Sequence, residues 1–521
     1  MKNTLLITVL LIGLGNLTQA QDYFIKGVNI EETSSDTGLR IIADETGYAI
    51  VCGSLFFGNT LGGMGIVKTD LQGNKIWENA FNDSPNESGI AGFCKLADGN
   101  YMITGATYKP GLSWQDTFVK VNSSNGDTLR TTYFGDSLRN RAAFSTLDNY
   151  GNHIAFSTYG VVIQYSHNIL LKLDTAGQVT HSYPLADVPD YNYQYSEEII
   201  VLPNGEYVMA IGAESDTVDI HGFVRKTDSI GTTIWQHQLN DYATNAISIE
   251  VMLLQDGNFV VTWFEPPNPQ TEPKSSHFIR CYNPEGGQLW QHTFWSVLGY
   301  GWNIQALSLC ANGDIICCGY TGNLSVTGNP TCWMARLSSS GELYWLREYV
   351  WWEAASQVMF LYDLDEDPYG DIVATGVAGL PNSQGIIDEH AVLLKVNPQG
   401  CLSPDCNDTI IVYSVVTGVD SPSPPPSGSP NNSEYKPFAV LYDPPAARLH
   451  LMAADLEVVG TYINRFTLYD LQGRVAAAQS LAPHQAGYQI DISLLPSGIY
   501  AYVFTDRSGA AVQRGKVVVV R

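Results

Sequence analysis

The chain has 521 residues, 45% of them apolar, which is enough for a large core and for more than one domain. Only 15% are charged, so we expect a surface of uncharged polar residues, as in many extracellular β-proteins. The formal net charge of −25 repels phosphate backbones and anionic membranes and argues against nucleic acid as a partner.

The N-terminus predicts a secretory signal peptide over residues 1–20. Lys2 gives a positively charged n-region, and Leu5 to Leu14 is a short apolar h-region. Thr18-Gln19-Ala20 resembles a small-residue cleavage site. The alternatives are a buried strand and a retained anchor. No later stretch approaches the ~20 consecutive apolar residues of a membrane span. We therefore expect a secreted mature chain without a transmembrane segment, either extracellular or attached to the outer-membrane surface.

A repeated unit organises residues 21–412. Each unit has two glycine turns, each flanked by apolar strands, with no helical period between them. Asp-Gly and Asn-Gly favour tight hairpins because glycine accepts a positive φ. The first-turn glycines are Gly47, Gly99, Gly151, Gly205, Gly257, Gly313 and Gly370, and the second-turn glycines are Gly73, Gly126, Gly177, Gly231, Gly286, Gly341 and Gly400. The pattern predicts an all-β fold, a seven-bladed β-propeller, with a linear β-solenoid as the alternative.

The seventh unit lacks its last strand. After Gly400 a short cysteine loop follows, where other units have a further strand. The segment 23–28 precedes the first unit and belongs to none. We predict that it completes the seventh unit, which would close the ring and remove an exposed sheet edge.

Tryptophan recurs four residues after the second-turn glycine in four units, as Trp77, Trp235, Trp290 and Trp345. The segments Asp70-x-x-Gly73-x-x-x-Trp77 and Asp228-x-x-Gly231-x-x-x-Trp235 resemble the Trp-docking pattern of quinoprotein-like propellers. The resemblance implies that these side chains pack between blades, which is a structural role and says little about chemistry.

The long loops carry many other aromatic residues. Both glycine turns of a unit should lie on one face of a propeller, which places the long loops together on the opposite face. Exposed aromatic side chains offer platforms for sugar rings or peptides, and packing between loops is the alternative. The candidate ligand-binding residues are Trp114, Trp263, Trp295, Trp302, Trp351, Trp352, Tyr191, Tyr193 and Tyr195.

The nine cysteines include two pairs close in sequence. Cys401 and Cys406 flank four residues, and outside the cytosol we expect them to form a disulfide. Cys317 and Cys318 are adjacent. A vicinal disulfide of the kind some quinoprotein dehydrogenases carry is one interpretation, and two ordinary residues of one strand is the favoured one.

Catalytic and metal-binding motifs are absent from the sequence. Asp363-x-Asp365-x-Asp367 alternates carboxylates as a calcium loop does, but Pro368 breaks that pattern, and a solvated acidic turn is the favoured interpretation. No serine-hydrolase, zinc-protease or phosphate-loop motif occurs. We therefore predict no catalytic residue, no metal site and no cofactor.

The composition changes after the repeats. Residues 413–437 are rich in proline and serine and predict a linker. Residues 438–521 have short strands and turns that suit a small immunoglobulin-like β-sandwich. Residues 466–475 and Leu495-Pro496-Ser497-Gly498-Ile499-Tyr500 resemble the type A sorting domain of the type IX secretion system of Bacteroidota. The matching positions include Gly473, Pro496, Gly498, Tyr500, Lys516 and Arg521, while Tyr442-Asp443-Pro444-Pro445 replaces the family's opening Pro-Asn-Pro.

The sorting resemblance implies export across the outer membrane, with the secretion machinery as partner, whereas an ordinary interaction sandwich is the alternative. For the repeats, the favoured interpretation is a non-enzymatic module that binds a glycan or a protein on the long-loop face. The alternative is an extracellular enzyme, carbohydrate-active or quinoprotein-like. Carboxylates gathered at the centre of the ring would favour the enzyme, and an aromatic rim poor in carboxylates would favour binding.

Overall fold

The computed structural model describes most of the chain between residues 23 and 519. The described ranges are 23–28, 30, 36–53, 64–81, 88–135, 139–161, 165–215, 220–239, 247–265, 276–294, 302–321, 332–349, 359–381, 387–402, 438–443, 448–453, 463–469, 474–481, 487–496, 498–506 and 511–519. The predicted signal peptide and linker lie outside them. The described residues form strands and turns, without a helix.

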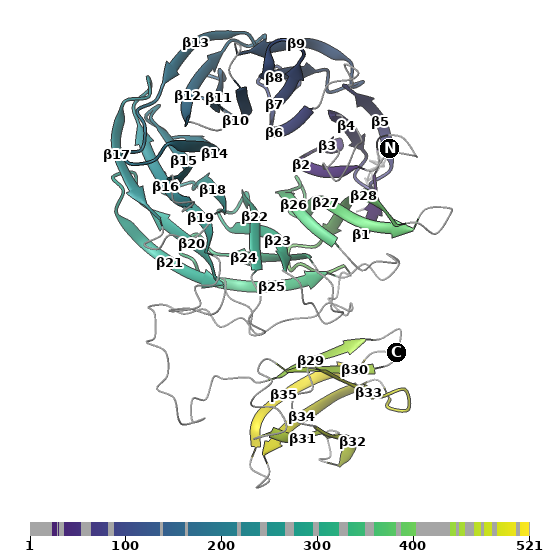
Figure 1. Ribbon diagram of the computed structural model, residues 1–521. Helices are drawn as coiled ribbons and strands as arrows, with labels where there is room; N and C mark the ends of the chain where they lie inside the picture. Colours follow the sequence, from purple (N-terminus) through teal and green to yellow (C-terminus); the bar gives the residue numbers. More distant parts are fainter. Residues whose placement is uncertain are drawn as a thin grey trace, which may run out of the picture.

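Seven antiparallel four-stranded sheets surround a common axis (Figure 1). Unit 1 is β2 (Thr37–Asp44), β3 (Gly47–Gly53), β4 (Met64–Thr69) and β5 (Lys75–Ala80). Unit 2 is β6 (Ser88–Lys95), β7 (Tyr101–Lys109), β8 (Ser113–Val121) and β9 (Thr128–Phe134). Unit 3 is β10 (Arg139–Leu147), β11 (His153–Val161), β12 (Tyr165–Leu173) and β13 (Val179–Pro184). Unit 4 is β14 (Tyr193–Val201), β15 (Tyr207–Glu214), β16 (Ile220–Thr227) and β17 (Thr233–Gln238).

The remaining units continue round the ring. Unit 5 is β18 (Ile247–Leu253), β19 (Phe259–Glu265), β20 (Ser276–Tyr282) and β21 (Gln288–Phe294). Unit 6 is β22 (Trp302–Leu309), β23 (Ile315–Thr321), β24 (Cys332–Leu337) and β25 (Leu343–Tyr349). Unit 7 is β26 (Met359–Glu366), β27 (Ile372–Pro381), β28 (Ile387–Val396) and β1 (Phe24–Gly27). In each unit the first strand lies innermost and the last lies on the perimeter (Figure 1).

The predicted closure by residues 23–28 is confirmed. β1 pairs antiparallel with β28, and Phe24 lies opposite Lys395. This is the position that tryptophan takes in unit 1, where Trp77 lies opposite Lys68. β1, the first described strand in the chain, thereby belongs to the last unit of the ring. The outer edge of β28 is covered by this pairing.

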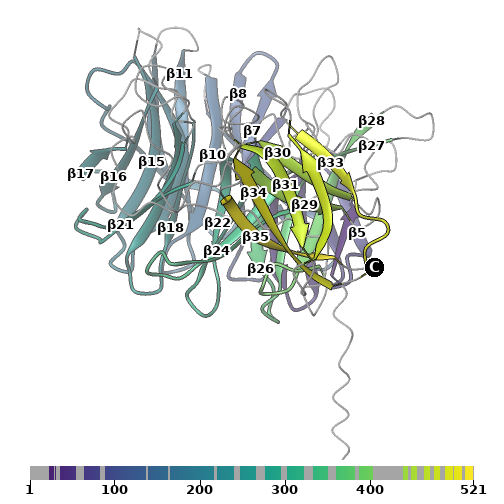
Figure 2. The same ribbon diagram turned by 90° about the horizontal axis from the view of Figure 1, so that it is seen from below.

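The predicted turn glycines all adopt a positive φ, between 74° and 87° except for Gly47 at 128°. In units 1 to 6 the two glycine turns join strands one to two and three to four, and in unit 7 the second turn follows the third strand, β28. Antiparallel order therefore places both turns at the same end of the sheet, which we call the turn face, and puts the other connections at the long-loop face. Figure 2 views the ring from its side, with the strands running between these faces.

The core lies between neighbouring sheets. Second and third strands are buried on both sides, as in β3 and β4, because each sheet is covered by the units before and after it. One apolar cluster joins Cys318 and Met334 of unit 6 to Leu361 and Leu394 of unit 7. Another joins Val373 and Leu393 of unit 7 to unit 1. Contacts between units, rather than within one sheet, therefore hold the ring together.

The recurrent tryptophans pack across these interfaces onto the second-turn glycine of the next unit. A Cβ atom added to Gly126 would lie 2.5 Å from the Trp77 ring, and one added to Gly400 would lie 2.8 Å from Trp345. Trp345 Nε1 also donates a hydrogen bond to Pro398 O, 3.1 Å away. At the closure Phe24 takes this place against Gly73.

This packing predicts unequal effects of alanine at two turn glycines of unit 2. Gly99 and Gly126 have φ of 82° and 79°, so each Gly→Ala change should cost about 1–2 kcal/mol from the left-handed backbone. Gly99 has open space around it, whereas Gly126 touches Trp77. We expect Gly126→Ala to lose a further ~1–3 kcal/mol through overpacking, measured by chemical denaturation. Equal losses would show that the tryptophan contact contributes nothing.

The C-terminal residues form two further sheets. One is β29 (Phe438–Asp443), β30 (Arg448–Ala453) and β33 (Gly487–Asp491), and the other is β32 (Val475–Ser480), β31 (Ile463–Tyr469), β34 (Gly498–Asp506) and β35 (Ala511–Val519). Phe466, Leu468 and Phe504 pack with Leu449 and Leu451 in one buried cluster. The two sheets therefore share a core of their own.

Candidate functional site

The predicted aromatic site residues do not form one platform. Trp263 is 1% exposed, so its predicted place on an exposed rim is wrong. Its ring stacks on Phe278 with centroids 4.8 Å apart, the Arg280 guanidinium covers it at 4.6 Å, and its Nε1 donates to Glu265 Oε1 at 2.8 Å. Packing, the alternative interpretation, accounts for this side chain.

Trp114 is half-buried and adjoins exposed side chains on unit 2. Its ring meets Tyr108 edge-on at 6.1 Å, and Tyr108 and Leu112 are 40% and 52% exposed. Tyr133 is 38% exposed, with the Lys109 ammonium 3.9 Å from its ring centroid. We call Tyr108, Leu112, Trp114 and Tyr133 the unit-2 aromatic cluster. It lies at the long-loop end of β7, β8 and β9.

The predicted tyrosines lie on unit 4. Tyr191 packs edge-on against His221 and Phe223, at 5.5 and 5.3 Å, and Tyr195 donates to Glu214 Oε2 at 2.8 Å. Tyr193 is half-buried at the start of β14. Trp302 begins β22 on unit 6, and Trp295, Trp351 and Trp352 lie outside the described residues.

The remaining predicted positions are partly described. Cys401 is disulfide-bonded, and its predicted partner Cys406 lies outside the described residues. Tyr500 donates its hydroxyl to Pro496 O at 2.8 Å, Gly498 begins β34, and Lys516 lies in β35. Gly473 and Arg521 fall outside the described ranges. Cys317 and Cys318 are free and buried in β23, so the vicinal disulfide is excluded and the strand interpretation is confirmed.

A second site, which the sequence interpretation missed, lies on the axis of the ring. Every first strand has a register shift, and the first paired residue after it is Arg40, Gly92, Phe144, Glu198, Glu250, Ala306 or Asp363 in units 1 to 7. Arg40 interacts electrostatically with Asp363, Glu250 and Glu198, on three different units. Together with the equivalent register positions, these interactions indicate that the four side chains lie toward the axis of the ring. We call Arg40, Glu198, Glu250 and Asp363 the axial cluster.

Arg40 and Asp363 form the ionised half of the axial cluster. Arg40 donates from Nε to Ala91 O at 3.1 Å and from Nη1 to Leu39 O at 3.2 Å, which fixes the guanidinium. Asp363 Oδ2 accepts the Ile41 N–H at 2.8 Å. Burial raises the pKa of Asp363 to about 6, while Arg40 and the Ile41 N–H oppose that rise. Asp363 is therefore a carboxylate at neutral pH.

Glu198 and Glu250 form the protonated half. Their side chains are hydrogen-bonded to each other, which requires that the pair holds a proton. Burial raises the pKa of Glu198 to about 7, against the attraction of Arg40. Burial and then the charge of Glu198 raise the pKa of Glu250 well above its usual value. The axial cluster thus combines a retained carboxyl proton with a carboxylate, which are the two groups that general acid–base catalysis needs.

The pKa shifts predict how the axial cluster affects stability. Between about pH 4 and 7 the folded protein binds more protons at these carboxyls than the unfolded chain, so their contribution to stability falls as the pH rises. We expect the difference in Tm between the double variant Glu198→Gln, Glu250→Gln and the wild type to favour the variant more at pH 8 than at pH 5. A difference between the two proteins that does not change with pH would contradict this.

The acidic run in unit 7 is a clamp between units and not a solvated turn, so that interpretation is wrong. Asp363 and Asp365 accept the free N–H groups of Ile41 and Ala43 on the inner edge of β2, at 2.8 and 2.9 Å. Asp367 is 2% exposed and accepts bonds from Tyr48 and Lys395. All three carboxylates are used in joining unit 7 to unit 1.

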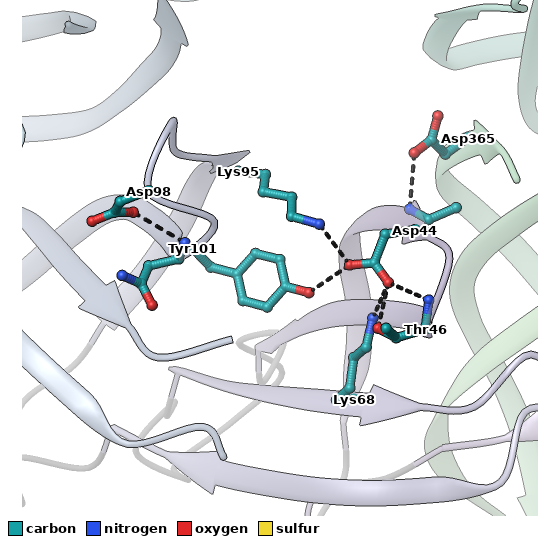
Figure 3. A network of polar contacts seen from close by, with 9 residues as sticks. Asp44, Thr46, Lys68, Lys95, Asp98, Tyr101 and Asp365 are labelled. Carbon is teal, nitrogen blue, oxygen red and sulfur yellow. Dashed lines mark hydrogen bonds and ion pairs between the residues drawn. The ribbon is translucent and has the colours of Figure 1, made fainter. Parts of the chain in front are cut away.

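The same clamp recurs between units 1 and 2 (Figure 3). Asp44 receives Lys68 and Lys95, each at 2.9 Å, and the hydroxyl of Tyr101 at 3.2 Å. Burial alone would raise the pKa of Asp44, but hydrogen bonds from Thr46 and the two lysines hold it well below its usual value. Because Asp44 repeats the arrangement of Asp367 with Lys395 and Tyr48, we assign these two carboxylates to structure and not to chemistry.

Two features are absent from the described residues. No group of three or more histidine, cysteine, aspartate or glutamate side chains is placed to hold a metal ion. The part of the chain that the structure covers also has no long apolar helix of the kind that crosses a bilayer.

Comparison with known proteins finds only distant likenesses to solved structures. No protein-family model matches it, and no curated protein does. Among solved structures, a Bacteroides caccae protein of unknown function is 15% identical, with a TM-score of 0.34 over 58% of this chain and 94% of that one. A GH93 α-L-arabinofuranosidase of Fusarium graminearum is 10% identical, with a TM-score of 0.40 over 59% and 93%. A fungal alcohol oxidase of the AA5 family is 11% identical, with a TM-score of 0.44 over 95% and 98%.

These likenesses are too low to carry any function to this chain. What the structure itself defines is an all-β protein of repeated four-stranded antiparallel sheets in a propeller-like ring.

Proposed function

We propose that the protein is an exported, glycan-cleaving seven-bladed β-propeller, with the axial cluster as its acid–base site. The observation that carries this proposal is the pair Glu198–Glu250 on the inner strands, which interacts electrostatically with Arg40 and Asp363 at the equivalent positions of two other units. Paired carboxyl groups with different protonation states are what cleavage of a glycosidic bond requires. Carboxylates at the centre were the feature expected to favour an enzyme over a binding module.

Each residue of the axial cluster has a role in the proposed cleavage. Glu250 donates its proton to the leaving glycosidic oxygen as the bond to the anomeric carbon breaks. Asp363 accepts a proton from the water whose oxygen bonds to that carbon. Arg40 keeps Asp363 ionised, and Glu198 keeps the proton on Glu250 through its charge. After one turnover a proton passes from Asp363 to Glu250 through solvent, so the balance is restored.

The test uses the mature full-length chain on a panel of polysaccharides: xylan, arabinan, mannan, laminarin and mucin glycans. Release of new reducing ends by the wild type, lost in Glu250→Gln, is the expected result. Absence of release from every member of the panel, at pH values from 5 to 8, would reject the enzyme.

A second candidate function, binding without catalysis, is favoured by the unit-2 aromatic cluster. Its exposed rings suit sugar rings or a peptide segment. Trp114→Ala and Tyr133→Ala should each weaken retention on an immobilised glycan about tenfold if this surface binds. The same assay applies to Trp302 and Trp351, which stay predicted ligand residues.

We also infer that residues 438–521 are a detachable sorting domain that follows a signal peptide, residues 1–20, and a linker, residues 413–437. The support is the residue pattern that resembles the type IX sorting domain, together with a two-sheet arrangement having its own core. Deletion of residues 438–521 should retain the protein in the periplasm of its host, measured by cell fractionation. Export of the truncated chain at the wild-type level would reject the inference.

A further inference from the structure

A histidine outside the axial cluster is held in one orientation by a chain of polar side chains. His167 lies near the start of β12, in unit 3, and its Nδ1 is 2.7 Å from Asp187 Oδ1. The same Asp187 oxygen accepts Gln194 Nε2 at 3.0 Å. Gln194 is fully buried in β14, the inner strand of unit 4, and its Oε1 accepts the Val188 N–H at 3.1 Å. The chain therefore runs from a buried amide to a surface imidazole.

The connection that carries Asp187 is anchored on both sides. Leu185 and Val188 are 6% and 2% exposed and pack in the core between units 3 and 4. Asp187 itself is half exposed, because it lies between these anchors on the surface. Its carboxylate is thus presented at a fixed place, and His167 is oriented by it.

This arrangement fixes the tautomer of the neutral imidazole. A carboxylate can only accept, so Nδ1 must carry the proton that points at Asp187. Nε2 then has a lone pair, and none of the described residues donates a hydrogen bond to it. The His167 side chain is 31% exposed, so this acceptor is open to a ligand.

Two tyrosines border the imidazole on the same face of the sheet. Tyr159 lies opposite His167 in the β11–β12 ladder, with ring centroids 5.6 Å apart. Tyr165 precedes it by two residues, at 5.5 Å, and is 45% exposed. An oriented acceptor, a half-exposed carboxylate and an exposed aromatic ring therefore occur together at the long-loop end of units 3 and 4.

We propose that His167, Asp187 and Tyr165 form a binding subsite for a neutral sugar ring. A sugar hydroxyl donates to His167 Nε2, a second hydroxyl donates to the exposed side of the Asp187 carboxylate, and the C–H face of the ring packs on Tyr165. Acceptors and a carboxylate disfavour acidic sugars, so the ligand class is neutral. This subsite rests on the glycan ligand proposed above and is separate from the axial cluster.

The test combines binding with spectroscopy on the mature full-length chain. Affinity electrophoresis in xylan, arabinan, mannan and laminarin should show retardation by at least one neutral polysaccharide. His167→Phe keeps the ring but removes the acceptor, and we expect it to weaken that retardation about tenfold, as should Tyr165→Ala. His181→Phe, at an exposed histidine of the outer strand β13 in the same unit, should bind as the wild type does.

Nitrogen NMR of the histidine rings supplies a readout that needs no ligand. The expected result is a His167 imidazole protonated at Nδ1, with this preference lost in Asp187→Asn. Wild-type retention by His167→Phe, a proton on Nε2, or no retardation by any polysaccharide would each overturn the subsite. Loss of turnover in Glu250→Gln together with unchanged binding by His167→Phe would reject the subsite alone and leave the enzyme standing.

Discussion

Glu250→Gln is expected to lower glycan turnover by ~10²–10⁴-fold, the usual contribution of a general acid. Glutamine has the size of the protonated carboxyl and can keep the hydrogen bond to Glu198, so the ring should stay folded. The amide cannot give up a proton to the leaving group. Turnover is measured as reducing ends released per enzyme, and affinity for the same polysaccharide should change little.

A matched control is Glu285→Gln, an exposed glutamate in a turn of the same unit, which should keep full turnover. Glu198→Gln gives a separate signature. Its negative charge helps to raise the pKa of Glu250, so removing it should move the alkaline limb of the rate profile to lower pH. Turnover by Glu250→Gln at the wild-type rate would show that the proton comes from elsewhere.

The pH profile of the wild type follows from the same groups. Asp363 must be ionised, so activity should fall below its pKa of about 6. The acid Glu250 must hold its proton, and burial together with the charge of Glu198 raises its pKa well above the usual value, so activity should fall again only above that raised pKa. We therefore expect a bell-shaped profile of kcat/KM with its maximum between these values. Activity that rises steadily from pH 5 to 9 would contradict the assignment of acid and base.

The repeat could be predicted because its signals are local. Glycine turns require a positive φ that other residues avoid, and all fourteen glycines predicted to lie in turns have one. The closing strand could be predicted by counting strands, since unit 7 lacked one. The tryptophans could be placed between units because Trp77 and Trp345 share one offset from their turns. In each case a few neighbouring residues carry the information.

The axial cluster depends on contacts across the ring and was therefore missed. Arg40 and Asp363 are far apart in sequence, and only the ring closure brings β2 beside β26. One sequence signal could have found the cluster. Arg40, Glu198, Glu250 and Asp363 each lie seven residues before the first-turn glycine of their unit. Reading that offset in all seven units shows which side chains meet at the axis.

The sequence also could not predict which side chains are exposed to solvent. Trp263 and Trp114 both lie near long loops, yet Trp263 is covered by Phe278 and Arg280 while Trp114 is half-buried and adjoins exposed side chains. The acidic run of unit 7 was misinterpreted for a related reason. Asp363 and Asp365 meet backbone donors of a strand more than 300 residues earlier, and no local pattern indicates those partners.

Lys395→Met is expected to destabilise the ring by about 3–5 kcal/mol, the usual cost of removing one partner from a buried ion pair. The Lys395 ammonium lies 2.9 Å from Asp367 and 3.3 Å from Asp371, and these carboxylates are 2% and 1% exposed. Lys395 also donates to the hydroxyl of Tyr48, across the closure between units 7 and 1. Methionine fills the space but leaves both carboxylates without a cation. Guanidinium denaturation followed by tryptophan fluorescence measures the loss.

Lys68 of unit 1 is equivalent to Lys395 and provides the control. Lys68 lies opposite Trp77, as Lys395 lies opposite Phe24. Lys68→Met leaves Asp44 with Lys95 at 2.9 Å and with Thr46, so its cost should be only about 1 kcal/mol. The penalty of Lys395→Met should also shrink near pH 4, since burial raises the pKa of Asp371 and the carboxyl can take up a proton. Equal losses in the two variants, or a penalty unchanged at pH 4, would mean that the closure does not depend on this buried charge.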